Sequence, residues 1–452
     1  MPYWASTLAL IVAAAGSAAA GTQFTVTPAL RPQVDFWVSI FATYGKHQIV
    51  IHDTERLDRV YSVLDFRDLA RAGVTDGEID SVMREQEAVE KDRVRALLLQ
   101  LDADPDAAGS SSEQLRMRAL FASDPAPAKY RAAADRLRGQ RGLRERFAQG
   151  IQIAHAYFPQ MEAIFARAGV PLEITRLPLV ESTFNMKAYS KVGAAGVWQF
   201  MPGTARRFMR VDGAVDQRLD PLIATRAAAQ FLRENYDSLG SWPLAIKAYN
   251  HGPAGMARAV RETGSTDIAT IIREYRGPAF RFASRNFYPE FLAALHVERN
   301  YAKYFGDLAL HRAQPYASVV VPRPMTIGMA ARCAGTDTVE LAEDNPSLLP
   351  PVRGGRAAIP AGFELRVPAN SGTAFERCAA SLPPVSVARA RNRAPAARSR
   401  SAVTRVVHRV RAGQTLSGIA ARYGCSVEQV RARNSLKGRG VRTGQVLRIP
   451  RC

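Results

Sequence analysis

One carboxylate in the middle of the chain has the surroundings of a general acid. Glu181 ends the apolar run Leu177-Pro178-Leu179-Val180, and no further Asp or Glu follows before Asp212. A carboxyl group held against apolar neighbours has a raised pKa, because burial disfavours its charged form, and it can then donate a proton near neutral pH. Taken alone, the position also fits an ordinary glutamate that ends a helix and faces water.

Polar and aromatic residues follow Glu181 in three groups that could surround it. They are Ser182 with Phe184 and Asn185, then Ser190 with the run from Gly193 through Trp198 and Gln199 to Pro202, and later Ala248-Tyr249-Asn250 with Gly252. Their hydroxyl, amide and phenol groups could form hydrogen bonds beside the acid. Each of them has an ordinary alternative, since Trp198 and Tyr249 lie on helical segments and could be core residues.

These groups, in this order, resemble the catalytic domain of the soluble lytic transglycosylases (glycoside hydrolase family 23), and most of all the D-type membrane-bound lytic transglycosylases. The resemblance runs from about residue 142 to residue 305. It implies a lysozyme-like helical domain that cleaves the bond between N-acetylmuramic acid and N-acetylglucosamine in peptidoglycan. Carried over residue by residue, it makes Glu181 catalytic and assigns substrate-binding roles to Ser190, Gln199, Tyr249 and Asn250.

The carboxylate-poor stretch around Glu181 bears on the reaction type. Most glycosidases use two carboxylates, and here only a distant residue such as Asp216 or Asp220 could fold in as the second. In the resembled family a single Glu protonates the leaving sugar and then deprotonates the C6 hydroxyl of N-acetylmuramic acid, which closes a 1,6-anhydro ring. Two alternatives stay open: a lysozyme-type hydrolase that uses water, and a non-catalytic wall-binding protein.

The sequence departs from the family pattern before its late helix. Relatives carry Glu-Thr-x-x-Tyr-Val where this chain has residues 283–288, Ala-Ser-Arg-Asn-Phe-Tyr. The carboxylate is absent, Phe287 stands at the tyrosine position, and Tyr288 could replace some contacts. Trp198 is a milder departure that could reshape a subsite.

The segments that must position these residues are mainly helical. Between residues 142 and 305 apolar residues recur at helical spacing, and Gly or Pro marks each break. Residues 21–141 are interpreted as a mostly helical scaffold region. Within that region we interpret His52-Asp53 as a structural polar pair, because no nucleophile motif accompanies it. The expected fold class is mainly α, with small α+β modules at the C-terminus.

The C-terminal block, residues 405–452, resembles a LysM module, the βααβ domain that binds N-acetylglucosamine-containing glycans. The resemblance rests on Gly413-Gln414-Thr415-Leu416, Ile419-Ala420, Asn434 and the run from Gly444 to Pro450. It implies glycan binding by the loops that contain Gly413, Gln414, Thr415, Leu416 and Asn434. Residues 316–380 follow the same order without the Gly-x-Thr-Leu loop, which suggests a degenerate copy with a structural role.

Four cysteines, Cys333, Cys378, Cys425 and Cys452, all lie in the C-terminal third of the chain. They allow three disulfide pairings, of which sequence order favours Cys333–Cys378 and Cys425–Cys452. Zinc binding is the alternative, but no CxxC motif or histidine cluster accompanies them. We therefore expect disulfides, no metal and no cofactor.

Charge and the first residues of the chain point to the cell envelope. Residues 1–20 have the apolar run and the small residues of a signal peptide, and residues 381–404 form a basic linker rich in Pro, Ala and Arg. The net charge of +20, from 61 basic and 41 acidic residues, favours a polyanionic partner. We expect an exported, periplasmic or envelope protein without stable membrane insertion. Peptidoglycan strands are its expected partner, nucleic acid is not, and the protein should be monomeric.

Overall fold

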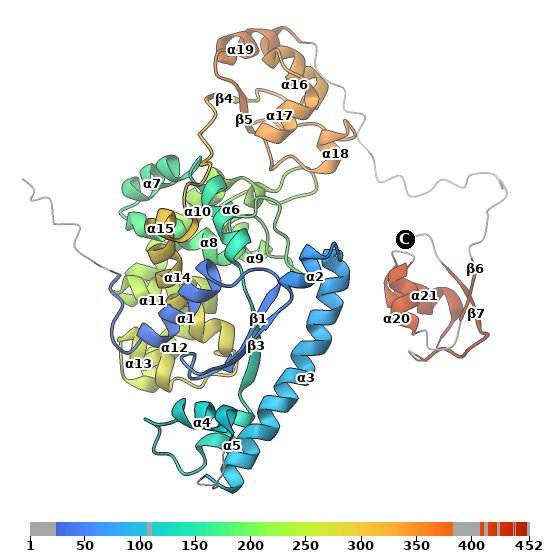
Figure 1. The fold of residues 1–452 in the computed structure, drawn as a ribbon. Coiled ribbons are helices and arrows are strands. Elements are labelled where there is room, and N and C mark those ends of the chain that lie inside the picture. Colours follow the sequence, from blue (N-terminus) through green and yellow to red (C-terminus); the bar gives the residue numbers. More distant parts are fainter. Residues whose placement is uncertain are drawn as a thin grey trace, which may run out of the picture. The chain divides into compact units, whose positions relative to one another are not determined.

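A computed structural model of the protein describes residues 24–105, 111–382, 407–410, 415–422, 425–436, 438 and 440–449. The chain divides into two compact units, residues 1–385 and 386–452, and each is described by itself (Figure 1). The expected signal peptide and almost all of the expected linker lie outside the described residues. Among the helices of the described ranges, none has the length and apolar character needed to cross a membrane.

The N-terminal region of the first unit combines helices with a small sheet. Its elements are α1 (Arg31–Ala42), β1 (Gln48–Asp53), β2 (Val60–Asp65), α2 (Arg67–Arg71), α3 (Asp76–Ala103), α4 (Ser112–Ala119), α5 (Lys129–Ala134) and β3 (Leu137–Arg141). The strands are antiparallel in the order β2-β1-β3. Successive side chains of a strand point to opposite faces, so Ile49 and Ile51 pack with α3 and α5 while Val50 packs with α1. The central strand is therefore buried on both faces.

Helix α1 is part of the core of the central domain, although it lies more than a hundred residues before that domain's expected start. Trp37 donates a hydrogen bond from Nε1 to Asn286 Oδ1 at 3.2 Å. Phe41 stacks on Phe147, with ring centroids 4.5 Å apart. The single apolar cluster of this core runs from Leu30 to Val297. The central domain therefore needs α1 to cover its core.

The central domain is helical, in agreement with its apolar periodicity. Its helices are α6 (Arg144–Ala154), α7 (Phe158–Arg167), α8 (Leu177–Ser182), α9 (Pro202–Ala205), α10 (Pro221–Leu239), α11 (Trp242–His251), α12 (Pro253–Thr263), α13 (Ile268–Glu274), α14 (Phe282–Arg299) and α15 (Tyr301–Phe305), with 3-10 turns at Leu172–Arg176 and Gln217–Leu219. Pro221 begins α10, where its missing N–H costs nothing. Gly240, with φ 69°, ends the same helix. Figure 1 shows α14 next to α1, α8 and α11, with which it packs.

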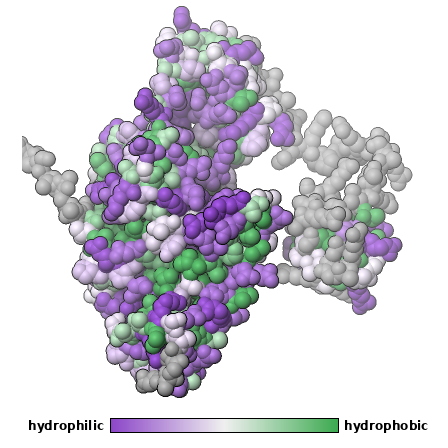
Figure 2. Space-filling view, viewed as in Figure 1, coloured by the Kyte–Doolittle hydropathy of each residue, from purple (hydrophilic) through white to green (hydrophobic). Residues whose placement is uncertain are grey.

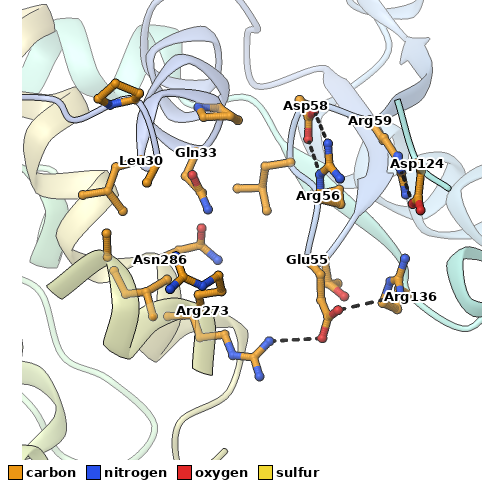
Figure 3. A pocket seen from close by; sticks show the side chains of 18 of the residues that line it. Leu30, Gln33, Glu55, Arg56, Asp58, Arg59, Asp124, Arg136, Arg273 and Asn286 are labelled. Atoms are coloured by element: carbon orange, nitrogen blue, oxygen red, sulfur yellow. Dashed lines mark hydrogen bonds and ion pairs between the residues drawn. The ribbon is translucent and has the colours of Figure 1, made fainter. Parts of the chain in front are cut away.

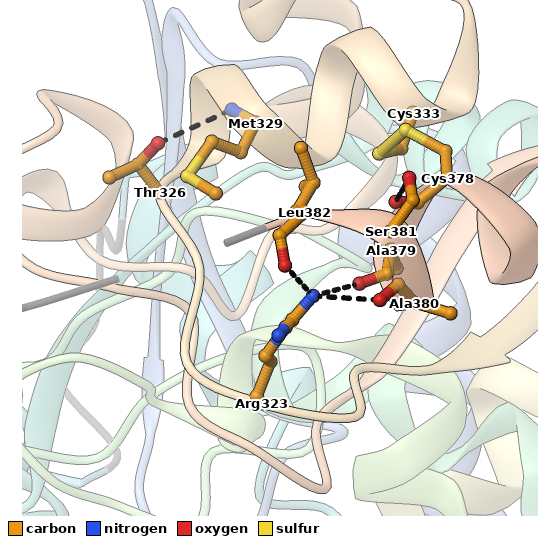
Figure 4. Close-up of a disulfide and its surroundings, with 9 residues drawn as sticks. All are labelled: Arg323, Thr326, Met329, Cys333, Cys378, Ala379, Ala380, Ser381 and Leu382. Atoms are coloured by element: carbon orange, nitrogen blue, oxygen red, sulfur yellow. Dashed lines mark hydrogen bonds between the residues drawn. A yellow bond between two sulfur atoms is a disulfide. The ribbon is translucent and has the colours of Figure 1, made fainter. Parts of the chain in front are cut away.

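Residues 316–381 form a module with an antiparallel strand pair. It contains β4 (Tyr316–Val320), α16 (Ile327–Ala334), α17 (Thr338–Asp344), α18 (Pro350–Arg353), β5 (Glu364–Pro368) and α19 (Gly372–Ser381). The expected Cys333–Cys378 disulfide is confirmed and joins α16 to α19. Beside it the Arg323 guanidinium donates to the carbonyls of Ala379 at 2.7 Å, Ala380 at 3.1 Å and Leu382 (Figure 4). These contacts close the end of the module.

The second unit has the expected βααβ order. Its elements are β6 (Val407–Arg409), α20 (Leu416–Arg422), α21 (Val427–Asn434) and β7 (Val446–Arg448), and the two strands pair antiparallel. A small apolar core contains Val410, Ile419, Val430 and Leu447. The expected Cys425–Cys452 pair includes Cys452, which lies outside the described residues.

One asparagine holds each of these modules together in the same way. In the second unit Asn434 Nδ2 donates to the carbonyls of Val430 at 2.7 Å and Arg448 at 2.8 Å, and its Oδ1 accepts from Arg448 N at 2.7 Å. In the first unit Asn345 Nδ2 donates to the carbonyls of Leu341 and Arg366, both at 2.8 Å. Its Oδ1 accepts from Arg366 N at 2.9 Å. The repeated clamp between helix and strand supports the interpretation of residues 316–380 as a diverged copy of the same module.

The surface of the first unit is mostly polar on the face seen in Figure 2, with apolar residues gathered near the middle of that face. Large apolar side chains that are exposed include Val82 and Val89 on α3. The polar cover is what a chain of ordinary hydropathy is expected to show.

Candidate active site

Glu181 lies in the last turn of the short helix α8. That helix begins at Leu177, with Pro178 in its first turn, and it ends where Thr183 and Phe184 adopt positive φ angles of 48° and 54°. Residues with a side chain adopt this conformation at a cost, and here the fully buried Phe184 ring holds the turn in place. The local strain stops α8 directly after Glu181 and leaves its side chain at the helix end.

The Glu181 carboxyl group has the electrostatics of an acid. It is neither fully buried nor freely exposed, and it makes no hydrogen bond or ion pair with any residue that the structure describes. Burial raises its pKa to about 8, and the negative charge of Glu290 adds to that rise. A carboxyl group with this pKa carries its proton at neutral pH and can give it to a substrate. The expectation drawn from its apolar neighbours agrees with this geometry.

The turn formed by residues 193–200 is fastened to the helix of Glu181. Ser182 Oγ donates to the carbonyl of Val197 at 3.0 Å. Gly196 has φ 74°, and a Cβ atom there would lie 1.8 Å from the carbonyl oxygen of Arg218. Only glycine fits this position, because both the backbone angle and the close approach exclude a side chain. The Ser182 contact therefore sets the position of the turn relative to Glu181.

Ser190 and Gln199, the expected sugar-binding residues, shape the same turn. Ser190 Oγ accepts from Ala194 N at 2.9 Å. Gln199, with φ 48°, donates from Nε2 to the carbonyl of Gly196 at 2.8 Å. Both side chains remain partly exposed. They hold the loop beside Glu181, and they are reachable for a ligand.

Tyr249 lies near Glu181, as the family resemblance implies. Burial, and next the negative charge of Glu181, raise the pKa of Tyr249 well above its ordinary value. Its hydroxyl donates to the carbonyl of Trp198 at 2.8 Å. Trp198 itself is fully buried, and its Nε1 donates to Thr225 Oγ1 at 2.8 Å. Trp198 is thus a core residue and does not line a subsite.

Asn250 is exposed and belongs to a polar cluster that the sequence analysis did not find. Its Oδ1 accepts from Lys247 Nζ at 3.4 Å and from Ser284 Oγ at 3.2 Å. Lys247 is fully buried, and it also donates to Ser284 Oγ at 2.8 Å. The Lys247 ammonium lies 4.8 Å from the centroid of the Phe280 ring. The segment 283–288 therefore contributes to the site through Ser284, while Phe287 and Tyr288 are buried in the core.

Glu290, on α14, is the second carboxyl group near Glu181. Burial raises its pKa to about 8, and the positive charges of Lys247 and Arg138 oppose that rise. Burial also lowers the pKa of Lys247 to about 7, although the negative charge of Glu290 opposes that fall. The negative charge of Glu290 is therefore part of the surroundings that set the pKa of Glu181. The only sequence signals were a lysine inside the apolar run 242–248 and an acid after Pro289.

Asp216 and Asp220, the two distant candidates for a second carboxylate, have other partners. Asp216 pairs with Arg218 at 2.7 Å and accepts from the Tyr189 hydroxyl at 2.8 Å. Asp220 caps α10 and pairs with Arg366 at 2.7 Å. Guanidinium groups therefore already hold both aspartates, and the negative charge that acts on the pKa of Glu181 comes from Glu290.

His52 and Asp53 form the structural pair that the sequence analysis favoured. His52 is fully buried, its Nδ1 lies 2.9 Å from the Asp53 carbonyl oxygen, and burial lowers its pKa to about 4. Asp53 is also fully buried and pairs with Arg136 at 2.9 Å. Both side chains serve the junction of β1 with β3 and belong to no catalytic arrangement.

The expected glycan-binding residues of the second unit are only partly described. Gly413 and Gln414 lie outside the described residues. Thr415 is exposed and Leu416 is buried, and both line a cavity of about 260 Å³ at the start of α20 and α21. Asn434 is occupied by the clamp to β7. No three His, Cys, Asp or Glu side chains within the described residues are arranged to hold a metal ion.

Comparisons with known proteins find two domain matches in the chain. Residues 161–272 match the transglycosylase SLT domain, and residues 408–450 match the LysM domain. Over 288 residues the chain is 27% identical to the membrane-bound lytic murein transglycosylase D of Escherichia coli strain K12. The aligned region is 63% of this chain and 61% of that protein. The chain thus spans about three fifths of the length of the curated relative that it matches.

Two solved structures also match part of the chain. An inactive variant of the lytic transglycosylase Slt from Pseudomonas aeruginosa aligns with a TM-score of 0.29 at 20% identity, over 45% of this chain and 32% of its own. The 70 kDa soluble lytic transglycosylase of Escherichia coli aligns with a TM-score of 0.27 at 18% identity, over 50% of this chain and 45% of its own. From the domain matches and the curated relative, the chain combines a transglycosylase SLT domain with a LysM domain and is homologous to the membrane-bound lytic murein transglycosylase D.

Proposed function

We propose that the protein is a peptidoglycan lytic transglycosylase of the cell envelope. The observation that carries this proposal is the state of Glu181, which lies within a matched transglycosylase SLT domain. Its carboxyl group has no cationic partner among the residues that the structure describes, and its pKa is raised to about 8. Its proton is the one a glycosidic oxygen needs when the bond breaks. Ser190, Gln199, Tyr249 and Asn250 hold the sugars around it.

The reaction then proceeds with Glu181 as acid and next as base. The protonated carboxyl group gives its proton to the oxygen of the leaving N-acetylglucosamine, and the bond from that oxygen to C1 of N-acetylmuramic acid breaks. The resulting carboxylate removes the proton of the C6 hydroxyl, whose oxygen bonds to C1 and closes the 1,6-anhydro ring. No water is consumed, and Glu181 ends protonated as it began.

Glu290 and Lys247 tune this cycle. Whenever Glu290 is ionised, its negative charge raises the pKa of Glu181 and so favours return of a proton to Glu181. The Lys247 ammonium limits the cost of a negative charge on Glu290 in the low dielectric of the site. With its pKa raised to about 8, Glu290 is mostly protonated at neutral pH. This supports a helper role over that of an ionised nucleophile or a base that activates water.

The C-terminal LysM domain directs the enzyme to its polymer. The cavity beside Thr415 and Leu416 supports binding of N-acetylglucosamine units there. Residues 316–380 have a structural role in this proposal, since Arg366 of that module holds the carboxylate of Asp220, which caps α10. The export and envelope location expected from residues 1–20 complete the proposal, with a monomer as the working form.

Analysis of the product tests the proposal directly. Purified peptidoglycan is digested with the full chain, and the muropeptides are separated and weighed. Anhydromuramoyl ends, lighter than reducing ends by one water molecule, support the transglycosylase. Reducing ends would instead identify a lysozyme-type hydrolase. Binding to the polymer without any release of muropeptides would identify a non-catalytic wall-binding protein.

A further inference from the structure

A cavity of about 620 Å³ lies between the N-terminal region and helices α13 and α14, and Glu181 is not among its lining residues (Figure 3). Its walls come from the residues before α1, the turn between β1 and β2, and the facing ends of α13 and α14. A second cavity of about 400 Å³ adjoins it and shares Thr54, Glu55, Arg136, Arg276 and Arg285 with it. The combined volume suits a ligand of several residues or rings.

The lining of the larger cavity has an excess of positive charge. Six arginines face three carboxylates there, namely Arg56, Arg59, Arg136, Arg273, Arg276 and Arg285 against Glu55, Asp58 and Asp124. Each of the three carboxylates is already paired with an arginine. Asp58 pairs with Arg56, Asp124 with Arg59 at 2.6 Å, and Glu55 with both Arg136 and Arg285. Figure 3 shows the pairs Arg56–Asp58, Arg59–Asp124 and Glu55–Arg136 on the wall formed by the N-terminal region.

Opposite the wall formed by the N-terminal region, Arg276 and Arg281 have no acidic partner within the described residues. Arg276 donates only to the backbone carbonyls of Arg273 and Tyr275. Arg281, which lines the adjoining cavity, donates to the carbonyl of Pro278 at 3.1 Å. Both side chains are exposed. A planar guanidinium group with free N–H donors binds a carboxylate through two parallel hydrogen bonds.

Helix α14 connects the cavities to the catalytic carboxyl groups. Arg285 lines both cavities, and Glu290 lies five residues further along the helix, a rise of about 7.5 Å. Arg138 interacts with both ends of this stretch of α14. Its guanidinium lies 4.3 Å from the centroid of the Phe282 ring, and its positive charge acts on the pKa of Glu290. A chain of four residues reaches about 14 Å when extended. A stem peptide is therefore longer than the helix rise that separates Arg285 from Glu290.

We propose that the paired cavities bind the acidic stem peptide of the peptidoglycan strand, with its carboxylates held by Arg276 and Arg281. This inference rests on the proposed function, since it assumes that the glycan strand lies at Glu181. The site recognises the anionic groups of the stem peptide through these two arginines. It makes the enzyme selective for strands whose peptides are still attached.

Binding of a free stem peptide tests the proposal without any need for turnover. The full chain with Glu181→Gln is titrated calorimetrically with the tetrapeptide that an amidase releases from peptidoglycan. Adding Arg276→Gln and Arg281→Gln should weaken binding by more than about tenfold, as expected for loss of hydrogen bonds to charged groups. Adding Arg167→Gln and Arg261→Gln instead removes the same charge from exposed positions outside the cavities and should leave binding unchanged.

Equal peptide binding by the two double variants would overturn the proposal, as would equal binding of a peptide whose carboxylates are amidated. Inorganic phosphate serves as a further probe. If phosphate binds in an Arg276- and Arg281-dependent way while the peptide does not bind, the site is an anion site of another kind and the proposal fails. The amidated peptide also covers the case in which the double variant does not fold. A wild-type chain that releases no anhydro products would overturn the proposed function, while the peptide titration still reports on the cavities.

Discussion

Two sets of enclosed carboxyl groups in the central domain differ in what faces them. Asp216 and Asp220 each meet a guanidinium group, at 2.7 Å from Arg218 and from Arg366 respectively. Although burial alone would raise the pKa of Asp216, hydrogen bonds from Arg218 and Tyr189 lower it. Glu181 meets another acid, Glu290, and has no cationic partner among the described residues.

The difference shows how one domain assigns opposite tasks to the same functional group. A carboxylate paired with arginine holds elements together, as Asp220 does for α10 and β5. A carboxyl group beside apolar residues and a second acid keeps its proton and is available for chemistry. The predictions below are ordered from the largest expected effect to the smallest.

Substitution of Glu181, which faces another acid instead of an arginine, should have the largest effect on activity. Glu181→Gln keeps the size of the side chain but cannot give up a proton, so kcat for release of soluble muropeptides should fall by roughly 10²- to 10⁴-fold. Glu234→Gln is the matched control, since it removes a half-exposed carboxylate paired with Arg207 in the same domain. Lysis at the wild-type rate by Glu181→Gln would remove this residue from the mechanism.

Removal of an acid from the paired set should damage stability instead. Asp220→Ala leaves the largely buried Arg366 without its partner, which costs about 3–5 kcal/mol in the free energy of unfolding. It also removes the cap of α10. The urea midpoint, followed by tryptophan fluorescence, should fall accordingly. Asp220→Asn retains the cap oxygen and should lose less. An unchanged midpoint for both variants would show that the ion pair contributes nothing.

The raised pKa of Glu181 should make the folded protein less stable as the pH rises. Its pKa is about 8 in the folded protein against 4.5 for the free group, so between these pH values the folded chain holds a proton that the unfolded chain has lost. Stability therefore falls with pH through this window. Glu181→Gln should remove that slope and be more stable than the wild type at pH 8, with a smaller difference at pH 4. A constant difference across the window would contradict the raised pKa.

The coupling within the unpaired set can be measured by Glu290→Gln. The negative charge of Glu290 raises the pKa of Glu181, so its removal should move the alkaline limb of kcat/KM to lower pH. A shift of about one unit is the lower end of what a neighbouring charge produces. Glu262→Gln, an exposed substitution on α12, should leave the limb in place. A limb unmoved by Glu290→Gln would mean that the two groups titrate independently.

The smallest effect is expected for an exposed ion pair that, like Asp220–Arg366, joins α10 to β5. Arg226 lies 3.1 Å from Glu364, and the two side chains are 48% and 50% exposed. Water and salt screen such a pair, so Arg226→Gln should change the free energy of unfolding by less than about 1 kcal/mol. A loss as large as that of Asp220→Ala would contradict the importance of burial in this comparison.

Residues close together in the sequence were predictable, and those brought together by packing were not. Glu181 and its turn were found because Ser182, Gly196 and Gln199 all lie within twenty residues of it. The Cys333–Cys378 pair was found because both cysteines belong to one small module. Glu290 and Lys247 were missed, since each looks like a solvated charge until α11 and α14 pack against α8.

The N-terminal region illustrates the same limit. Its helical periodicity predicted α3, but the buried strand β1 depends on pairing with β3, more than eighty positions away. The place of α1 in the core of the central domain likewise depends on residues more than a hundred positions away. Those contacts carry no local pattern. Glycine positions such as Gly196 were visible in the sequence, yet the reason for that glycine, the close approach of the Arg218 carbonyl, belongs to the fold.

The sequence by itself determined the helical class and the order of the SLT and LysM domains, and it singled out the candidate acid, because apolar periodicity and short motifs are local properties. Only the tertiary structure decided the protonation of that acid and which carboxylates are its neighbours. The pKa of a side chain depends on the burial and charge contributed by elements from distant parts of the chain. In this protein those elements are α14, which brings Glu290 to Glu181, and β5, which brings Arg366 to Asp220.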